Sequence, residues 1–141
     1  MEEILELKEL LLKGDMVGAL LLVEDLEEMG ISAIIGNIRR YAKFLLLHLI
    51  KQQAENRSTK SWEVSIRSSV EEIKFKNQRQ KAKEYYLSQE ELRDILDSVY
   101  DRAIDAASLE VAEGRYEPQE LSEKVFKRVI LNSAMVLLSN E

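Results

Sequence analysis

Apolar residues recur along most of the chain with the three- and four-residue spacing of helices rather than the two-residue spacing of strands. Residues 2–13 keep this spacing, and Gly14 supplies the left-handed position that commonly ends a helix. Asp15 can cap a second helical segment, which the pattern predicts to stop at Gly30. The first 30 residues are therefore predicted to form a helical hairpin.

The third predicted helix, residues 32–54, is apolar around most of its circumference. Ser32 can cap it, and a polar break at residues 55–60 follows it without Gly or Pro. The next helix starts close to Trp62, whose spacing to Ile66 places both side chains on one apolar stripe. A helix that is apolar nearly all round is predicted to lie at the centre of the fold.

The C-terminal third has the clearest helix boundaries. Ser88 and Glu91 have the spacing of a capping box ahead of a long apolar repeat, which Gly114 is predicted to end. Pro118 suits the first turn of a last helix. The pattern predicts a single all-α domain, residues 1–141, built as a compact bundle of five or six helices around the helix at 32–54.

Composition agrees with a helical protein, because 141 residues contain one Pro and five Gly. The chain has no Cys, which excludes a thiol nucleophile or thiolate metal site and fits a reducing compartment. Its N-terminus is acidic where a secretory signal would be basic, and no apolar run reaches the ~20 residues that span a bilayer. We therefore expect a cytoplasmic protein without a membrane partner.

The formal net charge of −6 hides a division along the chain. Residues 1–30 carry nine acidic and two basic side chains, whereas residues 31–83 carry twelve basic and four acidic ones. Residues 84–141 are acidic again, with thirteen acids and six bases. Such a division indicates either a basic surface for an anionic partner or oppositely charged helices packed side by side.

Candidate chemistry is sparse. His48 is the only histidine, and no second His, Ser-centred elbow or Gly-rich phosphate loop accompanies it. We expect a structural His with a hydrogen bond across a helix interface, and we predict no catalytic residue, cofactor or metal and no enzyme. A row of carboxylates with helical spacing is predicted to be a solvated face rather than a cation site: Glu90, Asp94, Asp97, Asp101 and Asp105.

The segment from 39 to 83 is the candidate anion-binding region. Its basic side chains could meet backbone phosphates, with Tyr41 or Phe75 available to stack on a base. An isoelectric point near 5.0 counts against a dedicated nucleic-acid binder. The predicted anion-binding residues are Arg39, Arg40, Lys43, Lys74, Lys76, Arg79, Lys81 and Lys83.

Four phrases resemble a bacterial, mainly cyanobacterial, family known as domain of unknown function twenty-nine. They are LVEDLEEMG (22–30), LLLHLIK (45–51), SWEVSI (61–66) and the long run EELRDILDSVYDRAIDAASLEVAEGRYEP (90–118). The resemblance implies an all-helical domain with no established activity, and it supplies no catalytic residue. Its motif residues are expected to be structural: His48, Lys51, Ser61, Trp62 and Ile66.

These motif residues flank one turn, so we expect the Trp62 ring to close it while His48 and Ser61 satisfy polar groups at the bend. The leading functional hypothesis is a non-catalytic protein–protein interaction module with an unknown protein partner or a homo-oligomer. The nearly uncharged final helix offers a surface for self-association. The alternative hypothesis is nucleic-acid or phosphate binding through residues 39–83.

Overall fold

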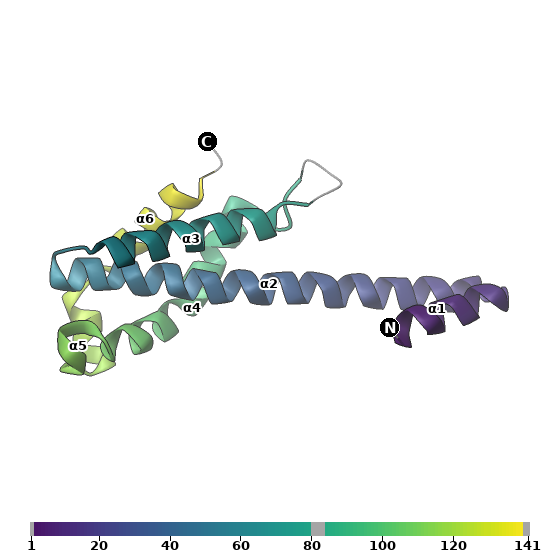
Figure 1. The fold of residues 1–141 in the computed structure, drawn as a ribbon, viewed down its shortest axis with the longest axis horizontal. Helices are drawn as coiled ribbons and strands as arrows, with labels where there is room; N and C mark the ends of the chain where they lie inside the picture. Colours follow the sequence, from purple (N-terminus) through teal and green to yellow (C-terminus); the bar gives the residue numbers. More distant parts are fainter. Residues whose placement is uncertain (1, 80–83, 140–141) are drawn as a thin grey trace. The chain divides into compact units, whose positions relative to one another are not determined.

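The computed structural model describes residues 2–79 and 84–139, and these residues form helices and no extended strand (Figure 1). The prediction of an all-α fold is confirmed. The chain separates into two compact units, Met1–Ile35 and Gly36–Glu141. The elements in chain order are α1 (Glu2–Leu12), α2 (Met16–Glu55), α3 (Lys60–Asn77), α4 (Gln89–Ser108), the 3-10 helix η1 (Val111–Gly114), α5 (Pro118–Lys124) and α6 (Lys127–Leu138).

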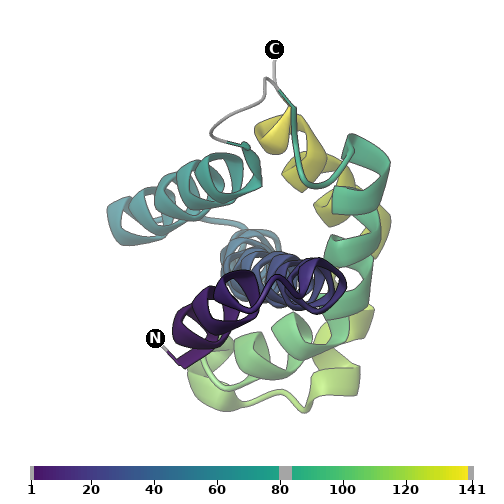
Figure 2. The same cartoon turned by 90° about the vertical axis from the view of Figure 1, so that its right-hand side faces the viewer.

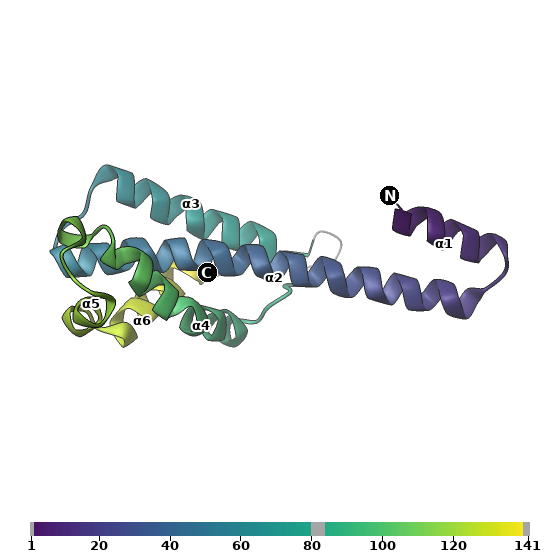
Figure 3. The same cartoon turned by 90° about the horizontal axis from the view of Figure 1, so that it is seen from below.

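The first unit consists of α1 and the beginning of α2, which run side by side in opposite directions (Figure 3). Gly14 has a φ of 75° and ends α1 as the sequence indicated. The Asp15 carboxylate then accepts a 2.9 Å hydrogen bond from the Gly18 amide, so it caps α2. The predicted hairpin is therefore present, and its turn is built by these residues.

The helix α2 differs from the prediction, because it continues from Met16 to Glu55 without a stop at Gly30 or a new start at Ser32. A glycine inside a helix costs about 1 kcal/mol relative to alanine, but it ends the helix only where it turns left-handed. Gly30 does not adopt a positive φ. The end of α2 falls instead at Asn56, whose φ of 51° supplies the turn without Gly or Pro.

The core of the second unit surrounds the last five turns of α2. Figure 2 looks along α2 and shows α3 and α4 on opposite sides of it. The side chains of α2 that are almost completely buried include Ile38, Leu45, Leu46 and Ile50. This result confirms the predicted central apolar helix, because the buried side chains form a broad face of α2 and helices lie on both sides of it.

The capping box at the start of α4 is confirmed: the Ser88 hydroxyl accepts from the Glu91 amide, and the Glu91 carboxylate accepts from the Ser88 amide, both at 3.1 Å. The predicted end at Gly114 is wrong, because α4 stops at Ser108. A separate 3-10 turn follows, and Gly114 ends that turn with a φ of 78°.

Pro118 opens a helix as predicted, but the last predicted helix is two helices, α5 and α6. Val125 and Phe126, which connect α5 to α6, have extended backbone. The Gln53 side chain on α2 accepts a hydrogen bond from the Phe126 amide at this break. A contact that is remote in sequence thus fixes a boundary that local periodicity could not reveal.

Candidate functional site

The turn between α2 and α3 is closed by the side chain of Trp62, which is 9% exposed. Two cations lie over its ring: Lys51 Nζ and the Arg57 guanidinium carbon are each 4.8 Å from the ring centroid. The Thr59 hydroxyl accepts from the Trp62 amide at 3.1 Å and caps α3. This arrangement is a tryptophan held between the end of one helix and the start of the next.

Lys51 is the most unusual member of this cluster, because a lysine side chain is rarely buried. The whole residue is 7% exposed, and its Nζ is 3.0 Å from Glu110 Oε1. The carboxylate of Glu110 is half exposed, so the ion pair joins a buried ammonium to a solvated partner. The cluster of Lys51, Trp62 and Glu110 ties the α2–α3 turn to the segment that follows α4.

His48 does not take the role expected for it at the bend. Its Nδ1 lies 2.8 Å from the Phe44 carbonyl oxygen one turn earlier in α2, so the ring bonds within its own helix. The cations that meet the Trp62 ring are Lys51 and Arg57, and Ser61 is exposed to solvent. Ile66 is buried, in agreement with its predicted place on the apolar stripe of α3.

The acidic row on α4 is solvent-exposed as predicted, at Glu90, Asp94, Asp97, Asp101 and Asp105. Within residues 2–79 and 84–139, no group of three or more His, Asp or Glu side chains could hold a metal ion. Asp97 pairs with Lys127 of α6 at 2.9 Å. The ion pairs of the described residues do not join this row to the basic residues of α2 or α3.

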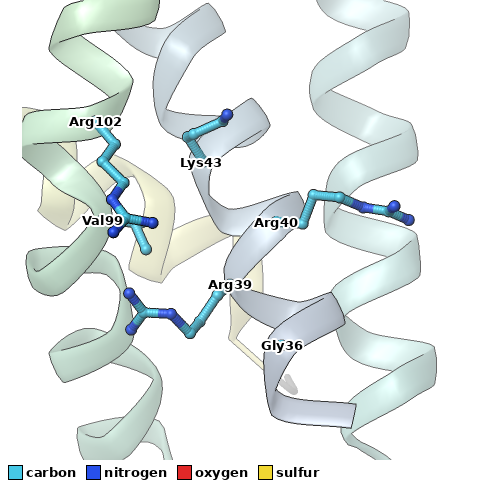
Figure 4. A pocket seen from close by; sticks show the side chains of 6 residues that line it. All are labelled: Gly36, Arg39, Arg40, Lys43, Val99 and Arg102. Atoms are coloured by element: carbon cyan, nitrogen blue, oxygen red, sulfur yellow. The ribbon is translucent and has the colours of Figure 1, made fainter. Parts of the chain in front are cut away.

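Three of the predicted anion-binding residues gather in one pocket of about 240 Å³ between α2 and α4. Its lining consists of Gly36, Arg39, Arg40, Lys43, Val99 and Arg102. In Figure 4, Arg39 and Arg102 extend into the same gap beside Val99, while Arg40 points away from α4. Arg102 was not among the predicted residues, because it lies within a run of acids and only the packing of α4 on α2 brings it to Arg39.

The other predicted basic residues that the structure describes lie on α3 or directly after it. Lys76 pairs with Glu72 at 3.7 Å and lies 5.8 Å from the Tyr41 ring centroid. Arg79 lies 4.9 Å from the Tyr86 ring centroid. Lys74 lines a different pocket, and Lys81 and Lys83 fall outside the described residues. The structure thus brings together the α2 members of the predicted set and not the set as a whole.

That second pocket is a larger apolar groove of about 550 Å³ between α2, α3 and α6. Leu49, Ile66, Val70 and Leu137 supply its apolar surface. Charged side chains of α3 border it: Glu63, Arg67, Glu71 and Lys74. The final helix therefore contributes Leu137 to a groove and also exposes Val136, which is 75% accessible.

The first unit has the largest accumulation of exposed apolar side chains. Ala19 is the one buried residue among residues 2–35, and α1 has none. Four exposed positions on α1 share one face by their spacing, and four at the start of α2 share another. We name these eight residues the apolar stripes: Ile4, Leu5, Leu11, Leu12, Met16, Val17, Leu20 and Leu21.

Comparison with known proteins identifies a family to which the sequence is similar. No curated protein and no solved structure matches the chain. No described helix has both the length and the apolar character needed to cross a membrane. The match to the family described as "Domain of unknown function DUF29" extends over residues 9–129, which is most of the sequence, so the chain belongs to that family.

Proposed function

We propose that this chain is a non-catalytic protein–protein interaction module that self-associates through the two helices of its first unit. The observation that carries the proposal is the burial within residues 2–35, where Ala19 alone is buried and the eight residues of the apolar stripes are all at least half exposed. The helix α1 and the beginning of α2 bury so little that they have no adequate core of their own.

The partner that best covers these stripes is a second copy of the same unit. Two helical hairpins that pack face to face make a four-helix bundle, in which every helix gains a neighbour for its apolar side. Each stripe residue is at least 50% exposed, so burying it at an interface contributes about 1–2 kcal/mol. In a two-fold symmetric dimer each residue is buried on both copies, so its contribution to the free energy of association is counted twice.

Charge predicts how such an assembly responds to salt. The first 30 residues carry nine acids and two bases, so two copies of the unit repel each other at low ionic strength. Salt screens this repulsion, because the Debye length falls from about 10 Å at 0.1 M to about 3 Å at 1 M. Self-association through the first unit therefore tightens as salt rises, which is opposite to the salt dependence of nucleic-acid binding.

The test is the molar mass of the chain by light scattering after size-exclusion chromatography, for wild type and two matched variants. Leu20→Glu places a carboxylate on an apolar stripe at a side chain that is 58% exposed, so the monomer tolerates it. Its expected effect is to raise the dimer dissociation constant by at least about 30-fold, from two lost apolar contacts per dimer.

Val136→Glu is the control, because Val136 is 75% exposed on α6 in the second unit. The proposal predicts that this variant keeps the wild-type mass. Loss of the dimer in Val136→Glu with retention in Leu20→Glu would place the interface on the final helix and refute the proposed surface. A monomeric wild type would refute self-association itself.

A cytoplasmic location, which the absence of Cys supports, belongs to the same proposal.

A further inference from the structure

The pocket between α2 and α4 is lined by basic side chains of the second unit, which have no role in self-association through the first unit. Arg39, Lys43 and Arg102 contribute three positive charges to one cavity of about 240 Å³. None of these three forms an ion pair with a carboxylate elsewhere in residues 2–79 and 84–139. Like charges held together repel each other, and an anion bound between them would remove that repulsion.

The interactions of these side chains leave most of their donors available. Arg39 donates from Nη1 to the Ser98 hydroxyl at 2.8 Å, which holds its guanidinium against α4. Lys43 Nζ lies 5.5 Å from the Phe44 ring centroid. Figure 4 shows the Arg39 and Arg102 side chains reaching into one gap from different helices. Two planar guanidinium groups and an ammonium are the donors that recognise tetrahedral oxyanions.

Gly36 makes room for a ligand at one edge of this pocket. It lies inside α2, where alanine would be a better helix former, and a β-carbon at this position would meet no atom within 4 Å. The space beside Gly36 is therefore open, and a larger side chain would extend into it without a clash. A substitution at Gly36 can fill the pocket while leaving every cation in place.

The surroundings select for a small ligand. Asp101 and Asp105 are exposed on α4 on either side of Arg102. They would repel a polynucleotide, whose phosphates extend beyond the pocket, more than a ligand with one or two phosphates. We propose that Arg39, Lys43 and Arg102 bind the phosphate group of a small molecule in the pocket between α2 and α4.

The experiment is isothermal titration calorimetry of the full chain with pyrophosphate, in about 50 mM NaCl to limit screening. Arg102→Gln removes one cation from the pocket and is expected to weaken binding at least about tenfold, as the loss of a charged hydrogen bond does. Gly36→Leu is expected to abolish binding by occupying the space, with an unchanged circular dichroism spectrum.

Arg67→Gln is the matched control, because Arg67 is exposed on α3, lines the other groove and loses the same charge. It is expected to bind pyrophosphate as wild type does. Equal weakening in Arg67→Gln and Arg102→Gln would mean that the chain attracts anions without a site. Unchanged binding in Gly36→Leu, no binding by wild type, or tighter binding of a thymidine dodecamer than of pyrophosphate would each overturn the proposal.

Discussion

Replacing Trp62 with alanine removes the side chain that closes the turn between α2 and α3. Trp62 is 9% exposed, and a tryptophan buried to this extent covers roughly 200 Å². At about 25 cal/mol per Å² the buried area is worth at most about 5 kcal/mol. Measured truncations of buried aromatic residues cost about 3–5 kcal/mol. We expect the free energy of unfolding to fall by about 3–5 kcal/mol in Trp62→Ala.

The cations over the ring refine this expectation. Lys51 and Arg57 each lie 4.8 Å from the ring centroid, and a cation over an aromatic face contributes about 0.5–2 kcal/mol, most where it is desolvated. Trp62→Phe keeps an aromatic face for Lys51 and most of the apolar contact. This variant is expected to lose about half as much stability as Trp62→Ala or less.

The assay is urea unfolding followed by circular dichroism at 222 nm, because Trp62 is the chain's one tryptophan and its fluorescence would vanish in both variants. Measurements at two protein concentrations separate folding from association. A loss of under about 1 kcal/mol in Trp62→Ala, or equal losses in both variants, would refute the view that the ring is a buried closure of this turn.

Three further predictions concern other parts of the structure. Gly30→Ala should raise stability by about 0.5–1 kcal/mol, since Gly30 lies within α2 with no atom close to its position for a β-carbon; a decrease in the thermal unfolding temperature would indicate a helix break there. Glu110→Ala should lower the free energy of unfolding, measured in urea, by about 1–3 kcal/mol, because it leaves the buried Lys51 ammonium without its carboxylate. Lys51→Met removes the buried charge itself and should cost less stability, so the reverse order would contradict this account of the ion pair. Burial, with the adjacent Asp101 charge, raises the pKa of Tyr100 to about 12, above its ordinary value of about 10. The unfolded chain therefore releases this proton first, so stability should fall by at most about 2 kcal/mol between pH 10 and pH 12. Tyr100→Phe should lack this pH-dependent component in urea unfolding measured across that range.

Local signals in the sequence were sufficient for elements whose boundaries are made by local contacts. The Gly14–Asp15 turn and the Ser88–Glu91 capping box both depend on residues within four positions of each other. Gly30 shows the limit of the same reasoning, because a glycine can end a helix or continue it at a modest cost. Which one occurs depends on the backbone conformation, and Gly30 stays helical inside α2.

The candidate sites show a similar division. Arg39 and Lys43 were predicted from their place in a basic segment, but Arg102 comes from a helix whose charge pattern is acidic. Lys51 was identified by family resemblance, whereas its partner Glu110 lies 59 residues away. Sequence order gives no information on such pairs, because helix packing determines which side chains meet.

The exposed apolar stripes could not be recognised from periodicity alone. Leu20 and Leu22 are both apolar positions of the same helix, yet Leu20 is exposed and Leu22 is half buried in the first unit. The helical pattern identifies apolar positions and leaves open whether a neighbouring helix covers them. Burial in the structure separates the two, and it moved the proposed association surface from the final helix to residues 2–35.

Sedimentation equilibrium of the full chain at low and high salt tests the central claim most directly. We predict a molar mass above that of one chain at both salt concentrations. The dissociation constant of the dimer should decrease between about 0.1 M and 1 M NaCl, because salt screens the repulsion between the acidic first units. A mass of 16.3 kDa at both salt concentrations, or an assembly that dissociates as salt rises, would contradict it.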